Sequence, residues 1–164
     1  MQYMSLPVAQ REALLASLAN MPRYIEATMR VLTPEIARRR GHNDLFSPVE
    51  QVWHLADLER EGFGQRIDRL LTEAEPRLPD FDGAAIATAR QYRSLSLQEG
   101  LVAFREARRR NLSILRTLKA EAWNRVGQQD GVGRVSLCDM PSFMAQHDAA
   151  HRDEIETWKA QVSC

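Results

Sequence analysis

Apolar residues recur every three or four positions along most of this chain, which is the spacing of one face of an α-helix. The clearest stripe lies near the C-terminus, over residues 137–162. A stripe of this kind has to be buried against other helices. More than any other feature, this pattern limits the chain to helical architectures. The stripe consists of Leu137, Met140, Met144, His147, His151, Ile155, Trp158 and Val162.

Three further long segments show the same spacing. Two of them begin at Ser47-Pro48-Val49-Glu50 and Ser96-Leu97-Gln98-Glu99, where the serine can cap a helix and the glutamate completes a capping box. No alternating β pattern persists for more than a few residues. We therefore expect an all-α protein, a bundle of four amphipathic helices. The expected inward-facing residues are Leu14, Leu18, Met21, Ile25, Met29, Leu32 and Ile36; Val49, Val52, Trp53, Ala56, Phe63, Ile67 and Leu70; and Leu97, Leu101, Phe104, Leu112, Leu115 and Leu118.

Four features are expected to interrupt or join these helices. Pro22 should kink or split the first helix, and Gly41 is placed to end that region as a C-cap. A short helix is expected over about 84–93, after a proline-rich loop. The glycine-rich stretch from Gly127 to Arg134 predicts a flexible, hairpin-like connection to the last helix.

Composition narrows the class of protein. The 164 residues are enough for one well-packed core, so we expect a single domain over residues 1–164. With 22 basic and 22 acidic residues, no excess positive charge supports binding to nucleic acid. The sequence shows neither a signal peptide nor an apolar run of the ~20 residues that span a bilayer. The only two cysteines, Cys138 and Cys164, do not indicate a disulfide scaffold, so we expect a reduced, cytoplasmic setting. Neither cysteine lies in a metal-binding CxxC pattern.

Two inward-facing histidines give the strongest functional signal. His147 and His151 are four residues apart, so they are neighbours on the helix and can bind one metal ion. Alternatively, they are core histidines satisfied by neighbouring carboxylates. Each ring would then need its own buried partner, so the pair favours a metal.

A catalytic zinc-type site commonly has three protein ligands, so a third ligand is expected from His54, His42 or a carboxylate. His54 lies on a polar strip of the second long helix. That strip is compatible with a solvated helix face and equally with the wall of a wet cleft. His42, in a Gly-His-Asn-Asp segment, fits an exposed loop. The strip consists of Glu50, His54, Asp57, Glu61 and Asp68.

The segment His147-Asp148-Ala149-Ala150-His151 also differs by one residue from the H-E-x-x-H helix of zinc proteases. Aspartate is one methylene shorter than the glutamate that acts there as the general base. A helical wheel places Asp148 to one side of the histidine pair, and no further ligand follows in the segment 157–164. A protease is therefore not expected.

Several motifs together resemble the DinB-like family of metal-binding four-helix bundles. They are Phe46-Ser47-Pro48-Val49-Glu50 followed by His54-Leu55-Ala56-Asp57, and the pair His147-x-x-x-His151 in the last helix. The likeness covers nearly the whole chain, although Phe46 stands where relatives often carry tryptophan. It implies a divalent metal, nickel or zinc, held by His54, His147 and His151. It also implies a homodimer, and an activity of the thiol-transferase, isomerase or hydrolase kind in which a low-molecular-weight thiol can be a cosubstrate.

The expected function is that of a metal-dependent transferase or hydrolase acting on a small electrophilic substrate. Three neutral imidazoles leave an open position on a divalent ion, where water has its pKa lowered to roughly 7 or a thiol binds as thiolate. Glu50, Asp57 and Glu154 are candidates to accept hydrogen bonds from the histidines. The alternative is a non-enzymatic, dimeric helical binding module that carries three tryptophans and a structural metal or none.

Overall fold

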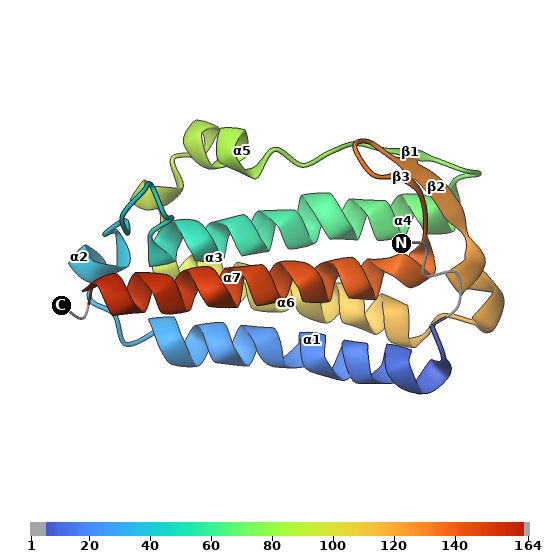
Figure 1. Ribbon diagram of the computed structural model, residues 1–164, viewed down its shortest axis with the longest axis horizontal. Helices are drawn as coiled ribbons and strands as arrows, with labels where there is room; N and C mark the ends of the chain where they lie inside the picture. Colours follow the sequence, from blue (N-terminus) through green and yellow to red (C-terminus); the bar gives the residue numbers. More distant parts are fainter. Residues whose placement is uncertain (1–5, 163–164) are drawn as a thin grey trace.

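Four long helices form the body of the protein, and a small sheet lies at one end of it (Figure 1). The computed structural model describes residues 6–162. The predicted four-helix bundle is confirmed. The long helices are α1 (Val8–Met29), α3 (Pro48–Asp57) continued through the π-helical segment Leu58–Gly64 into α4 (Gln65–Thr72), α6 (Leu97–Arg116) and α7 (Met140–Val162).

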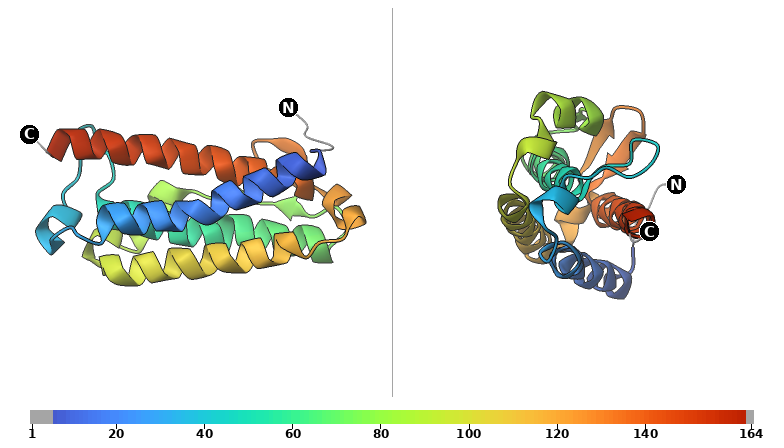
Figure 2. Two further views of the ribbon diagram at one scale, coloured as in Figure 1. Left: turned by 90° about the horizontal axis from the view of Figure 1, so that it is seen from below. Right: turned by 90° about the vertical axis from the view of Figure 1, so that its left-hand side faces the viewer.

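The order of the helices around the bundle differs from their order along the chain. Both α1 and α3 pack against α6 and α7, so α1 and α3 lie diagonally opposite each other. The helix α6 runs in the same direction as α3 and α4, because the segment between them returns along the outside of the bundle (Figures 1 and 2). This crossover carries β1 (Arg77–Leu78), α5 (Gly83–Ala89) and the 3₁₀ turn Tyr92–Ser94. It places α5 against α3.

Local signals in the sequence set several helix boundaries. Ser47 caps α3 in a full capping box, in which its N–H donates to Glu50 Oε2 at 2.9 Å and its Oγ accepts from the Glu50 N–H. Ser96 caps α6 by accepting from the Glu99 N–H at 3.2 Å. The expected split at Pro22 does not occur, because α1 continues through it to Met29.

The C-cap predicted at Gly41 was wrong. The helix α1 ends at Met29, and a separate short helix, α2 (Pro34–Ala37), follows it. Gly41 instead lies in a loop against α7, where an added Cβ would come within 2.6 Å of Gln161 Oε1. The glycine therefore permits the close approach of this loop to α7.

The small sheet is not predicted by the sequence pattern. Strands β2 (Val126–Gln129) and β3 (Gly133–Ser136) form an antiparallel hairpin, and β1 pairs in parallel with β2. The turn between them places Gly131 at φ +74°, a conformation that favours glycine. These strands have two to four residues, which is too short for a recognisable alternation. The connection predicted to be flexible and hairpin-like is an ordered hairpin.

Three charged side chains lie between two apolar clusters in the bundle interior. Glu59 comes from the π-helical segment, Arg108 from α6 and Asp148 from α7, and all three are buried. We call them the polar layer. The two carboxylates flank one guanidinium, so the layer has more negative than positive charge. The apolar clusters on its two sides include Met21, Ile25, Met29, Val52, Leu55 and Phe104, and Leu15, Leu18, Ile67, Leu70, Leu112 and Met144.

Two expectations concern the setting of the protein. Within residues 6–162, no helix combines the length and apolar character needed to cross a membrane, in agreement with the sequence. Cys138 is buried, and Cys164 lies outside the described residues. The cytoplasmic location stays a prediction.

Candidate metal centre

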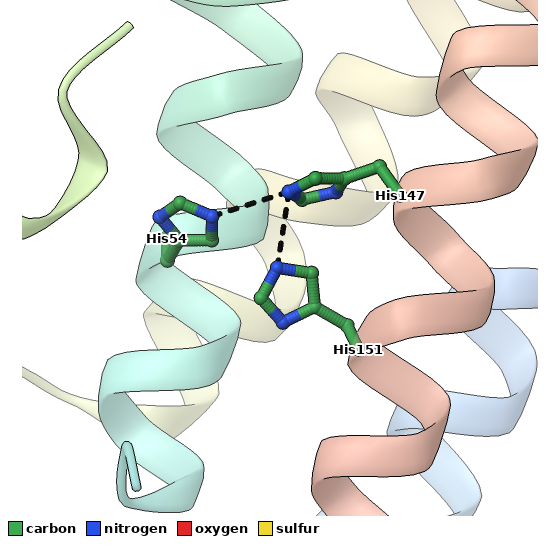
Figure 3. Close-up of side chains that lie close together, drawn as sticks. All are labelled: His54, His147 and His151. Atoms are coloured by element: carbon green, nitrogen blue, oxygen red, sulfur yellow. Dashed lines mark hydrogen bonds between the residues drawn. The ribbon is translucent and has the colours of Figure 1, made fainter. Parts of the chain in front are cut away.

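Three histidines meet between α3 and α7 (Figure 3). His54 comes from α3, and His147 and His151 come from successive turns of α7. The Nε2 atoms of His54 and His147 are 3.3 Å apart, and those of His147 and His151 are 3.0 Å apart. Candidate ligand atoms of the three residues all lie within 4.8 Å of one another. The structure therefore brings together the three residues that the family resemblance indicated.

These separations fit three ligands of one divalent ion. Imidazole nitrogens bind zinc at about 2.0–2.1 Å, which places two tetrahedral ligands about 3.3 Å apart. In the part of the chain that the structure describes, the group contains these three histidines and no carboxylate or cysteine. Structural zinc sites have four protein ligands, whereas catalytic sites have three and keep one position for water or substrate. The three histidines match in number the protein ligands of catalytic sites.

The second ring nitrogen of His151 has two acceptors. Its Nδ1 is 2.5 Å from Gln51 Oε1 and 3.1 Å from Glu154 Oε2. Gln51 Nε2 donates to the same Glu154 oxygen at 2.7 Å, which turns the amide oxygen toward the ring. Because both neighbours accept, we assign the proton to Nδ1 of His151 and the lone pair to Nε2, which faces the other histidines. Glu154 is thus the one predicted carboxylate partner found beside a histidine.

The structure pairs Glu50 and Asp57 with other groups rather than with His54. Glu50 accepts hydrogen bonds from Arg40 and closes the capping box of α3. Asp57 accepts from Tyr92 Oη at 2.5 Å and from Arg90, both in the crossover. The two carboxylates are only 3% and 1% exposed. At this end, the polar strip is therefore neither a solvated face nor a wet cleft but a set of buried bonds that hold neighbouring segments on α3.

Burial keeps His54 and His147 neutral. Burial, together with the smaller effect of the nearby His151, lowers the pKa of His54 to about 4 and that of His147 to about 2. The hydrogen bond from His151 is the main cause that lowers the pKa of Glu154 to about 2, so this group is a carboxylate at neutral pH. Neutral imidazole is the form that binds a metal. The lone pairs of His54 and His147 are therefore available at pH 7.

Aromatic rings surround the histidines. The rings of Phe46 and Phe81 meet that of His54 edge to face, each with centroids 6.0 Å apart. Phe63, from the π-helical segment, meets His147 in the same way at 6.1 Å. These three phenylalanines come from three separate segments of the chain. The surroundings of the histidine group are therefore largely apolar.

The crossover also touches His54 directly. Gly83, the first residue of α5, lies so close that an added Cβ would be 2.4 Å from His54 Cε1. Arg90, just after α5, binds Glu61 through two bonds of 2.9 Å and thereby fastens the crossover to the π-helical segment. Only a residue without a side chain allows α5 to cover the histidine at this distance.

Asp148 and His42 lie away from the histidine group. The Asp148 carboxylate faces Arg108 in the polar layer, so it is not placed as the general base of a zinc-protease helix. His42 is exposed, as expected for a loop residue. Gln51 is the residue near the histidines that the sequence did not reveal, because a single amide one turn before His54 gives no distinctive pattern.

A bundle whose second and last long helices bring three imidazoles together defines a helical protein with a candidate divalent-metal centre. The chain belongs to the DinB superfamily, whose family model matches residues 11–155. The family indicated by the sequence motifs is confirmed. No curated protein matches the sequence significantly.

The fold is shared with YfiT from Bacillus subtilis. The two structures superpose with a TM-score of 0.88 over 97% of this chain and 91% of that one, with 19% sequence identity. YfiT is described as a probable metal-dependent hydrolase with an unusual four-helix bundle topology. At this level of identity, the likeness establishes the fold alone.

Proposed function

We propose that this protein is a metal-dependent enzyme acting on a small electrophilic substrate, as a hydrolase or as a transferase of a low-molecular-weight thiol. The proposal is carried by the convergence of the Nε2 atoms of His54, His147 and His151. Nickel and zinc are the metals we propose. The description of YfiT as a probable metal-dependent hydrolase supports the hydrolytic version.

The residues present would give such a centre its chemistry. A divalent ion held by three neutral histidines lowers the pKa of a bound water to about 7, or binds a thiol as thiolate. Glu154 and Gln51 accept hydrogen bonds from Nδ1 of His151. These bonds fix the orientation of the ring and make its Nε2 a stronger metal ligand. The surrounding phenylalanine rings limit the access of water, which strengthens electrostatic interactions with a reacting group.

The alternative, a non-enzymatic dimeric binding module, receives less support. The three tryptophans of the chain make their contacts inside the protein. Trp53 Nε1 donates to the Ser96 carbonyl at 3.0 Å, and Trp158 Nε1 donates to the Arg39 carbonyl at 2.8 Å. Trp123 is 4% exposed. None of them offers the open aromatic surface that partner binding commonly uses.

Elemental analysis of the purified protein tests the proposal. We expect about one nickel, zinc or similar ion per chain in the wild type and in the control His42→Ala. The ion should be absent from His147→Ala/His151→Ala and strongly reduced in His54→Ala. Cooperative unfolding of each variant would confirm that it is folded. Equal metal content in the wild type and the double variant, or no uptake after incubation with Ni²⁺ and Zn²⁺, would refute the centre.

A further inference from the structure

A groove between α1 and α6 has an apolar floor. This edge of the bundle is opposite the α3–α7 edge that carries the histidines, and Figure 2 shows α1 and α6 side by side along it. The groove has a volume of about 220 Å³, and its floor includes Ala19, Pro22 and Leu112. The residues that line it recur every three or four positions on each helix. The groove is therefore a continuous trough formed by two facing helices.

The rim of this groove is strongly basic. It carries Arg23 on α1 and Arg105, Arg109 and Arg116 on α6, with Glu26 as its one carboxylate. Glu26 Oε2 is 3.7 Å from Arg105 Nη1. Among residues 6–162, the structure gives the other three arginine side chains no ion pair or hydrogen bond, and all three are exposed.

Folding alone does not account for this charge. Arg105 and Arg109 are an i, i+4 pair of like charge, which destabilises a helix. A cation is favourable in the last turn of a helix, and this explains Arg116, but Arg23 and Arg109 lie in helix interiors. The chain as a whole has a net charge of zero, so the basic rim is a local concentration.

The buried arginine beneath the rim does not add to the exposed positive charge of the groove. Arg108 also contributes to the groove, but it is 2% exposed, and its charge is neutralised from the interior by Glu59 and Asp148. The rim arginines are therefore left to solvent, above a floor that is fixed by the bundle core.

We propose that the groove binds a small amphiphilic anion, with a carboxylate or phosphate head and a short acyl or aryl tail. The forked guanidinium groups of Arg23 and Arg109 would bind the head from both helices, since arginine pairs bidentately with both kinds of anion. The tail would lie on Ala19, Pro22 and Leu112. The volume of the groove fits a small molecule rather than a protein partner. This site is separate from the histidine group and does not depend on a bound metal.

Calorimetric titration of the full chain with octanoate tests this site. Sulfate serves as a head without a tail, and octyl glucoside below its micellar concentration as a tail without charge. We expect one octanoate per chain, with binding at least tenfold weaker for either control ligand. The variant Arg23→Gln/Arg109→Gln should lose at least tenfold in affinity. The charge-matched control Arg30→Gln/Arg39→Gln, with both arginines exposed and outside the groove, should stay within twofold.

Backbone amide NMR shifts locate the ligand. Binding in the groove should change the amide chemical shifts of residues 19–26 of α1 and 105–116 of α6. Equal binding of sulfate and octanoate, or equal losses in the two double variants, would show general anion adsorption and overturn the proposal. Shifts centred on the histidines would overturn it as well, because the carboxylate would then be bound at the other edge. Within a supported proposal, tighter binding of octanoate or of octyl phosphate identifies the preferred head group.

Discussion

Arg108 and Asp148 join α6 to α7 through two parallel N–H···O bonds, each 2.8 Å long. The Arg108 Nε is also 2.9 Å from Glu59 Oε1 in the π-helical segment. Its Nη1 donates at 2.9 Å to the carbonyl of Leu18, which lacks its helical donor because Pro22 has no N–H. One buried guanidinium from α6 thus contacts the other three long helices, and it supplies the hydrogen bond that α1 loses at its proline.

Removing this guanidinium should destabilise the protein severely. Arg108→Met leaves the carboxylates of Glu59 and Asp148 buried without a cation, and breaking such a pair costs about 3–5 kcal/mol in the free energy of unfolding. Urea denaturation measures the loss. The exposed neighbour Arg109 is the control, and Arg109→Met should change stability by no more than about 0.5 kcal/mol. A loss of less than about 1 kcal/mol for Arg108→Met would show that the polar layer is not essential to the fold.

A side chain at Gly83 should disturb the histidine group. In Gly83→Val, the added Cβ meets the His54 ring at a separation that real atoms do not adopt, so either α5 or the ring has to move. We expect zinc affinity, measured by competition with a chromophoric chelator, to fall at least tenfold. The control is Ala84→Val, the same final residue at the next, exposed position. Equal affinities in the two variants would mean that His54 is not needed at its present position.

The acceptors behind His151 should tune metal affinity. Glu154→Ala removes the carboxylate that faces Nδ1, and the loss of such a partner typically weakens metal binding by about 10- to 100-fold. Gln51→Ala should act in the same direction. Asp153→Ala is the matched control, because this neighbouring carboxylate is exposed. If Asp153→Ala weakened binding as much as Glu154→Ala, the effect would be one of general charge.

Acid should weaken the attachment of the crossover to α3. Burial raises the pKa of Asp57, but hydrogen bonds from Tyr92, Arg60 and Arg90 outweigh it and hold this pKa below its ordinary value of 3.8. The resulting stability is present above the unfolded pKa of about 3.9 and is lost as pH falls through the lower, folded value. Asp57→Asn should therefore cost about 1.5–3 kcal/mol at pH 7. Denaturation at pH 7 and at about pH 3 should show this difference shrinking, and a constant difference would contradict the assignment.

The family resemblance leads us to propose a homodimer. Sedimentation velocity at micromolar concentration should then show a species of twice the chain mass of 18.7 kDa. A single species at the mass of one chain would contradict this prediction without affecting the histidine group, whose three residues belong to one chain.

The helices could be predicted because their signals act within one or two turns. Ser47 and Glu50 are three residues apart and form hydrogen bonds with each other, so the start of α3 is determined by local sequence. The position of His54 depends instead on which helix packs beside α3. Spacing alone left the third ligand open among His54, His42 and a carboxylate, and the family resemblance settled on His54.

The π-helical segment could not be predicted from the sequence. A wheel assumes 3.6 residues per turn and cannot reveal the wider turn over Leu58–Gly64, although the inward-facing residues Phe63, Ile67 and Leu70 that it predicted are buried. Glu59 also turns into the bundle, three residues after Ala56 and four before Phe63, but a charged residue on an otherwise apolar stripe gave no recognisable signal. The side chain of Asn111 donates to the Glu59 backbone carbonyl at 2.7 Å, a contact that exists only after α6 has packed. Both features arise from tertiary packing.

His54 and His147 are 93 positions apart, on the second and the last long helices. A growing chain therefore exposes His54 long before α7 has been synthesised, and no intermediate lacking α7 can assemble the three imidazoles. Uptake of the proposed metal by all three imidazoles would therefore have to follow the docking of the final helix. A bound ion would therefore stabilise only chains in which all four long helices have packed, and it would favour the fully folded state over intermediates that lack α7.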